Sequence, residues 1–162
     1  MGLKPLGGRV WARRGQRPIV RVPHRFQWRY LLAFVHPASG RTHWQVSSGI
    51  HTAVMSVVVE YFARAVGAGP RQRSVLVLEQ AGYHTSPLVQ VPEGLHLVFR
   101  PPYSPELQPA EHRWHYTDQP LINEHFPTIE ALEDALADHG ARLQRQRAVL
   151  RSATHFHWWP AI

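Results

Sequence analysis

Cysteine is absent from the 162-residue chain, which excludes disulfide frameworks, thiolate zinc sites and cysteine nucleophiles. Long apolar runs are lacking as well. Stretches such as 31–35 and 57–59 are far too short to span a bilayer, and no charged-then-apolar leader follows Met1. The sequence therefore predicts a soluble, cytoplasmic protein. Its 44% hydrophobic content and six Trp suit one domain over 1–162 with a core of its own.

Acidic residues are missing from the first part of the chain, where Glu60 is the first. Nine basic residues precede position 42: Lys4, Arg9, Arg13, Arg14, Arg17, Arg21, Arg25, Arg29 and Arg41. Arginine forks onto phosphate oxygens better than lysine does, although a genome rich in G and C would also favour its codons. This distribution indicates a nucleic-acid partner, with a merely solvated basic face as the alternative.

The remaining chain alternates between strand-like and helix-like patterns. Residues 1–25 are rich in Gly, Pro and Arg and predict an irregular lead-in. Five further segments are expected: a hairpin of 28–37 and 41–49, a helix over 52–65, strands at 74–80 and 95–102, and a final helix starting near Thr128. The run at 74–80 is almost uninterruptedly apolar, which is typical of a strand buried on both faces. We expect an α/β layer with a central mixed sheet, flanked by helices, and a C-terminal region at 128–162 whose aromatic tail packs back.

The stretch PPYSPELQPAEHRWH, residues 101–115, places four prolines ahead of Glu111. Because proline fixes its own backbone angle and disfavours helix in the residue before it, the arm up to Pro105 is predicted to be a rigid turn. Pro109 suits the first turn of a helix, which would carry Glu111. A glutamate there can simply favour the helix dipole.

A second acid, Glu79, follows the run VLVL at the carboxyl end of a predicted strand, where ligands of α/β sheets collect. One further strand and two turns between positions 79 and 111 would bring both carboxylates to one sheet edge. Converging carboxylates are what a pair of Mg²⁺ ions needs for phosphoryl transfer.

Two long motifs, VLVLEQAGYHTS and VPEGLHLVFRPPYSPELQPAEHRW, together resemble the catalytic-domain signature of mariner-type insertion-sequence transposases. These are DDE endonucleases with a ribonuclease-H-like fold, and WARRGQRP is similar to the segment they place after their first catalytic Asp. The resemblance implies DNA cleavage and transfer, dependent on Mg²⁺ or Mn²⁺, with Glu79 and Glu111 as catalytic and metal-binding residues. Gln80, Tyr83 and His84 would line the site, and DNA would be the partner, with a homodimer as a further expectation and no membrane or small-molecule cofactor. The expected DNA-binding residues are Arg9, Arg13, Arg14, Arg17, Arg21 and Arg25.

The chain departs from that signature at its acids. Glu79 and Gln80 stand where the family has Asp and Asn, so both side chains are one methylene longer than usual. The family's first Asp belongs upstream of WARRGQRP, and the sequence contains no acid before Glu60. We therefore expect a catalytic domain truncated at its N-terminus, with the first strand partly or wholly missing, and inactive alone. The alternatives are a non-enzymatic DNA-binding or partner-binding remnant and a nuclease with a remodelled metal site.

Other polar residues admit structural interpretations. His112 and His115 form H-x-x-H on one helix face, but without a third ligand at a sensible spacing a zinc site is not expected. Tyr83 and His84 can line a site or support the strand end. Trp114 is expected to anchor its helix in the core, and Ser104 has no evident base partner that would make it a nucleophile.

Overall fold

A computed structural model gives the structure of the chain and describes residues 1–3, 7, 9, 11–16, 19 and 27–156. Four strands and five α-helices are found there: β1 Tyr30–His36, β2 Arg41–Ser47, α1 Thr52–Val66, β3 Ser74–Leu78, α2 Gly82–Thr85, β4 Leu95–Phe99, α3 Trp114–Asp118, α4 Ile129–Arg145 and α5 Arg147–Thr154. Three 3₁₀ segments, η1 Pro105–Leu107, η2 Pro109–Arg113 and η3 Gln119–Leu121, surround α3. The predicted mixed α/β class is confirmed. In the described part of the chain, no helix has the length and apolar character needed to cross a membrane.

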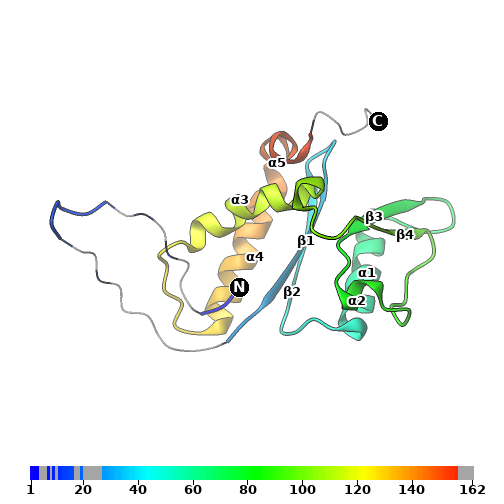
Figure 1. Cartoon of the computed structure of the whole chain (residues 1–162), viewed down its shortest axis with the longest axis horizontal. Helices are drawn as coiled ribbons and strands as arrows, with labels where there is room; N and C mark the ends of the chain where they lie inside the picture. The colour runs from blue at the N-terminus through cyan, green and yellow to red at the C-terminus, as the bar shows by residue number, and fades with distance from the viewer. Residues whose placement is uncertain (4–6, 8, 10, 17–18, 20–26, 157–162) are drawn as a thin grey trace.

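The predicted hairpin forms the centre of the molecule (Figure 1). β1 and β2 pair antiparallel with Tyr30 opposite Ser47 and His36 opposite Arg41. Gly40 closes the turn at φ 66°, a left-handed conformation that favours glycine. A Cβ at this position would collide with the backbone of Arg147, so α5 docks against the turn of the hairpin.

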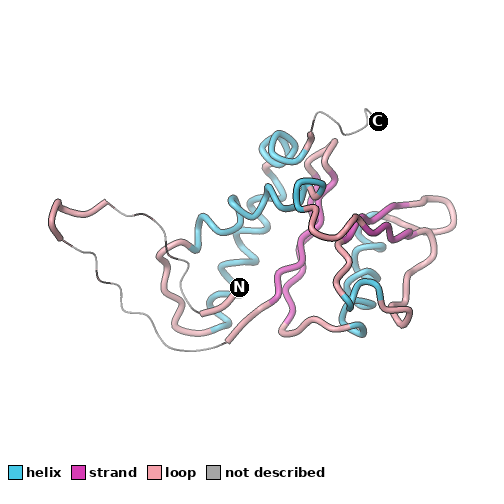
Figure 2. Tube along the Cα trace, in the orientation of Figure 1, coloured by secondary structure: helices cyan, strands magenta, loops and turns pink. Residues whose placement is uncertain are grey.

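The strands form two separate two-stranded sheets in the described residues (Figure 2). β3 and β4 pair parallel with each other, and neither pairs with the hairpin. The prediction that the first of these strands is buried on both faces is wrong. Leu76 and Leu78 are buried, whereas Val75 and Val77 are 63% and 42% exposed. Helix α1 covers one face of β3, and no described helix covers the other.

Helix α1 joins the two sheets through one core. Its buried face, including Met55, Val59 and Phe62, packs with Phe34 of β1 and with Leu76 of β3. The helix ends at Gly67, which has φ 74° and whose N–H donates to the carbonyl of Arg64. Both two-stranded sheets therefore pack against the same helix, α1.

A second core is formed by α4, η3 and the start of the chain, and α4 lies on the other side of the hairpin from α1 (Figure 1). The predicted final helix is confirmed as α4. Thr128 is its N-cap, and the cap hydroxyl accepts a hydrogen bond from the N–H of Ala131. Leu132 and Leu136 pack with Leu3 near the start of the chain. Helix α5 was not predicted, and the expected packing of the aromatic tail falls largely on residues 157–162, outside the described residues.

Candidate functional site

A cleft of about 790 Å³ lies between β1 and β3. Apolar residues of α1, among them Met55 and Phe62, contribute to its lining. Residues 107–111 and Trp114 line it from the segment that follows the proline-rich arm. Both acids singled out by the sequence, Glu79 and Glu111, belong to this lining.

Glu79 directly follows β3, with its side chain 47% exposed. One carboxylate oxygen lies 3.7 Å from a terminal nitrogen of the Arg100 guanidinium. The carbonyl of Glu79 accepts a hydrogen bond of 3.0 Å from Nδ1 of His84, which fixes the imidazole as the tautomer protonated at Nδ1. The backbone of Glu79 is thus held by His84, and its side chain lies beside Arg100.

Glu111 is carried by η2, in which Pro109 occupies the first turn as predicted. The segment is 3₁₀ rather than α-helical, and its tighter hydrogen bonding includes Glu111 N–H to the carbonyl of Gln108 at 3.0 Å. The α-helix begins only at Trp114. Glu111 is half-buried on the cleft.

Arg100 connects the two acid-bearing motifs. Its backbone N–H donates to the carbonyl of Leu78 at 3.0 Å, and its own carbonyl accepts from the amide of Gln80 at 2.9 Å. Its guanidinium donates to the carbonyl of Ser104 in the proline-rich arm. Gln80 is exposed and is not part of the cleft lining. Its hydrogen bond instead ties the end of β3 to the start of the arm.

Tyr83 and His84 both line the cleft. Burial, together with the charge of Glu79 and with Tyr30, raises the pKa of Tyr83. Burial lowers the pKa of His84, opposed by its hydrogen bond to the Glu79 backbone and by the Glu79 charge. His84 therefore both supports Glu79 and faces the cleft, as a neutral imidazole at neutral pH.

Sequence reasoning missed Arg113, which is fully buried two residues after Glu111. Its guanidinium lies 4.6 Å from the ring centroid of Trp44 and 5.5 Å from that of Trp114. It donates to the hydroxyl of Thr42 at 2.5 Å and to the carbonyl of Phe34 at 3.3 Å, while its Nε and second terminal nitrogen have no hydrogen-bond partner in the described part of the chain. Burial lowers its pKa to about 10.

Arg113, not Trp114, is the side chain that this segment buries in the core. The predicted anchoring of the helix by Trp114 is wrong, because Trp114 is only half-buried while Arg113 and Thr117 are fully buried. The available signal was spacing: Arg113 and Thr117 are one helical turn apart, on the face that meets the hairpin. An arginine at such a position is ordinarily assigned to the surface.

Metal-ligand sets of three His, Asp or Glu side chains do not occur among the described residues. The ring of His112 packs against Phe156 and that of His115 against Tyr116, so neither histidine is directed to a shared ion. Glu79 and Glu111 supply two carboxylates, one of them already facing Arg100. This donor set does not fit a pair of hard divalent cations, which need more oxygen ligands than two side chains provide.

The basic residues expected to bind DNA fall into two groups. Arg9, Arg13 and Arg14 are exposed, consistent with an accessible cationic segment. Arg17, Arg21 and Arg25 lie outside the described residues. Arg29, further along, forms an ion pair with Glu133 of α4 and so contributes to packing.

The chain is similar to known proteins in sequence and in fold. Residues 2–133 match the family model described as DDE superfamily endonuclease. Over 89 residues the chain is 36% identical to "Uncharacterized protein y4pE/y4sA" of Sinorhizobium fredii (strain NBRC 101917 / NGR234), a match covering 55% of this chain and 64% of that protein. The fold is similar to one in "Crystal structure of the Mos1 Strand Transfer Complex", with a TM-score of 0.61, 14% identity, and coverage of 98% of this chain and 53% of that one. The chain thus spans less than two thirds of the curated relative and about half of the solved one.

Proposed function

The chain belongs to the DDE superfamily of endonucleases, and from this premise we propose that it is a transposase-type DNA-processing domain that does not cut DNA alone. The observation that carries the proposal is that Glu79 and Glu111, from motifs on different elements, line one cleft. Both acids lie within the matched residues. The similar solved structure is that of a strand transfer complex, which supports DNA as the substrate class.

Inactivity follows from the composition of the cleft. Endonucleases of this superfamily are generally dependent on divalent metal ions, which supply the chemistry of phosphodiester cleavage. In this chain the two glutamates provide too few oxygen ligands for two such ions. Arg100 already places a positive charge 3.7 Å from the Glu79 carboxylate. The residues present would hold the acids in position without completing a catalytic centre.

DNA binding is assigned to the Arg-rich segment, of which Arg9, Arg13 and Arg14 are described and exposed. We expect these cations to contact phosphates, which releases counterions from the DNA and carries no sequence information. Binding should therefore be weak, independent of sequence and steeply reduced by salt. A triple substitution, Arg9→Gln, Arg13→Gln and Arg14→Gln, should weaken binding and flatten the salt dependence, since each lost contact reduces the slope by roughly one.

The experiment is nicking of supercoiled plasmid by the full chain with Mg²⁺ or Mn²⁺, run beside a DNA-binding titration at several salt concentrations. We expect binding without nicking. Glu111→Ala serves as the control for contaminating nuclease. Nicking that disappears in Glu111→Ala would overturn inactivity and favour a nuclease with a remodelled site.

A second candidate is a non-enzymatic remnant that binds DNA or a protein partner. The contact between Arg100 and Glu79 favours it, because a guanidinium rather than a metal ion then lies beside this carboxylate. Salt-insensitive DNA binding, or none at low salt, would favour a protein partner over DNA.

A further inference from the structure

Tyr103 stands at the tip of the proline-rich arm with its whole side chain in solvent. Its relative exposure is 100%, and its backbone has φ 56°, in the left-handed region. Pro102 and Tyr103 form a turn, and a positive φ after proline in a turn is ordinarily taken by glycine or asparagine. A tyrosine there costs free energy, which a fully exposed ring does not offset by packing. A strained backbone that presents an unpacked ring indicates a use for that ring outside the fold.

The turn is held on both sides. Before it, the carbonyl of Arg100 accepts a hydrogen bond of 2.9 Å from the side-chain amide of Gln80. After it, the carbonyl of Ser104 accepts from the Arg100 guanidinium and, at 3.2 Å, from the N–H of Leu107 in η1. The ring of Tyr103 therefore projects from an anchored turn.

The same anchor places Tyr103 beside the cleft that the two acids line. The Arg100 guanidinium that holds Ser104 also lies 3.7 Å from the carboxylate of Glu79. The arm crosses from β4 to the hairpin (Figure 1), and residues 107–111 at its far end line the cleft. Tyr103 is not part of that lining. Its ring thus lies at the rim of the cleft.

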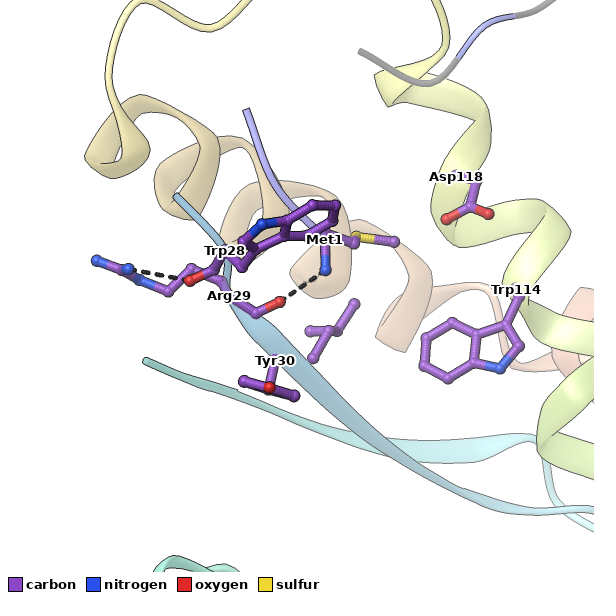
Figure 3. Close-up of a pocket in the computed structure, with 7 residues that line it drawn as sticks. Met1, Trp28, Arg29, Tyr30, Trp114 and Asp118 are labelled. Carbon is purple, nitrogen blue, oxygen red and sulfur yellow. Dashed lines mark hydrogen bonds between the residues drawn. The ribbon is translucent and has the colours of Figure 1, made fainter. Parts of the chain in front are cut away.

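Two other aromatic side chains that follow in the same part of the chain are used within the molecule. Trp114 lines a smaller pocket, to which Trp28 and Tyr30 also contribute (Figure 3). Tyr116 is half-buried. The fully exposed ring at the tip of the arm, by contrast, is free to receive a ligand.

We infer that Tyr103 stacks on an unpaired nucleobase of DNA held at the cleft and so positions a strand end beside the acids. Arg100, the cation next to the turn, is only 10% exposed and faces Glu79. The tip therefore offers a ring rather than a charge, which suits a base rather than a phosphate. An aromatic face stacks on any base, whereas a base inside a duplex is already covered by its neighbours. The inference rests on the proposed binding of DNA and names the part of the DNA that this ring holds.

The probe is a short DNA duplex that ends in a few unpaired nucleotides, compared with the same duplex with blunt ends. Fluorescence anisotropy with the full chain, in EDTA, measures binding to both. The wild type should prefer the unpaired end. Tyr103→Ala should lose about tenfold in affinity for that end, because it removes the stacking partner, and should bind the blunt duplex as before. Tyr103→Phe should keep the preference, since stacking needs the ring and not the hydroxyl.

A 2-aminopurine at the unpaired end reports stacking directly, because an aromatic ring stacked on this base quenches its fluorescence. The wild type should quench it, and Tyr103→Ala should not. Tyr103→Gly also removes the ring but suits φ 56°, so it should raise the midpoint of urea denaturation while losing the quenching. Tyr61→Ala is the matched control, since Tyr61 is 59% exposed on the regular helix α1, and it should leave both DNA readouts unchanged.

Three outcomes would overturn the inference. Equal preference for the unpaired end by the wild type and Tyr103→Ala would leave DNA binding in place and assign the exposed ring to a protein partner. Loss of affinity for both duplexes in a folded Tyr103→Ala would show that the tyrosine contacts paired DNA. Binding of neither duplex by the wild type would overturn the proposed DNA binding together with the stacking.

Discussion

The guanidinium of Arg100 lies 3.7 Å from the carboxylate of Glu79 and also donates to the carbonyl of Ser104. One side chain therefore fixes the first acid and the proline-rich arm that leads to the second. Its side chain is only 10% exposed, so its polar contacts are made with little help from water.

Replacing Arg100 should loosen the arm. Arg100→Ala is expected to lower the free energy of unfolding by about 1–3 kcal/mol, because it removes hydrogen bonds to a charged donor and leaves acceptors unsatisfied. Arg71→Ala, at an exposed arginine before β3, is the matched control and should change stability by less than about 0.5 kcal/mol. Urea denaturation measures both. Equal effects of the two substitutions would contradict a structural role for Arg100.

The stability of the fold should depend more on the volume of the side chain at position 113 than on its charge. Arg113→Ala leaves a cavity between Trp44 and Trp114 and should cost about 2–5 kcal/mol. Arg113→Met fills much of that space, and it orphans neither nearby group, because the Thr42 hydroxyl also donates to the Phe34 carbonyl at 2.6 Å. The methionine variant should match or exceed the wild-type stability in urea denaturation, since a buried cation without an acid partner is costly. Greater loss in Arg113→Met than in Arg113→Ala would be contrary to this view.

His84 should make the fold sensitive to acid. Its folded pKa lies below the usual 6.5 because of burial, so the folded state favours the neutral ring more than the unfolded state does. The stability from this group is present above about pH 6.5 and is lost as the pH falls toward the folded value. His84→Gln should reduce the loss between about pH 7.5 and 5, without abolishing it, because burial and Arg41 also lower the pKa of His43. An NMR titration of His84 giving a pKa above 6.5 would refute the assignment.

Local sequence patterns predicted most of the helices and strands, but they did not predict which strands lie side by side. Thr128 and the leucines of α4 define a helix by its cap and its 3.6-residue period, both readable without tertiary context. Helix α5 was missed because Val149 and Leu150 are its only large apolar residues, too few for a period. An apolar run such as 74–78 does not reveal whether a neighbour covers its second face, and here Val75 and Val77 remain exposed.

In the candidate site, too, the sequence predicted some residues and missed others. Glu79 and Glu111 were identified from their motifs, and both line the cleft. Their catalytic and metal-binding roles stay predictions. The contacts of Arg113 depend on segments distant in the sequence, because Trp44 of β2 is brought against the guanidinium by the packing of η2 on the hairpin. No local pattern encodes such a contact.

The last prediction concerns catalysis by the acid pair. Glu79→Asp shortens the side chain by one methylene and draws the carboxylate back from Arg100, giving the acid that the family usually has at this position. We expect no metal-dependent nicking from this variant, because two carboxylates still cannot fix two divalent ions that each require a nearly complete oxygen shell. Restoration should require Glu79→Asp together with a third carboxylate, supplied by a strand fused ahead of Met1 so that it continues the line of residues 1–3 into the cleft. The assay is nicking of supercoiled plasmid with Mg²⁺ or Mn²⁺, and the same proteins carrying Glu111→Ala control for contaminating nuclease. Nicking by Glu79→Asp alone that is lost on adding Glu111→Ala would show that the length of residue 79 was the only defect, and the proposed need for a third acid would then be wrong.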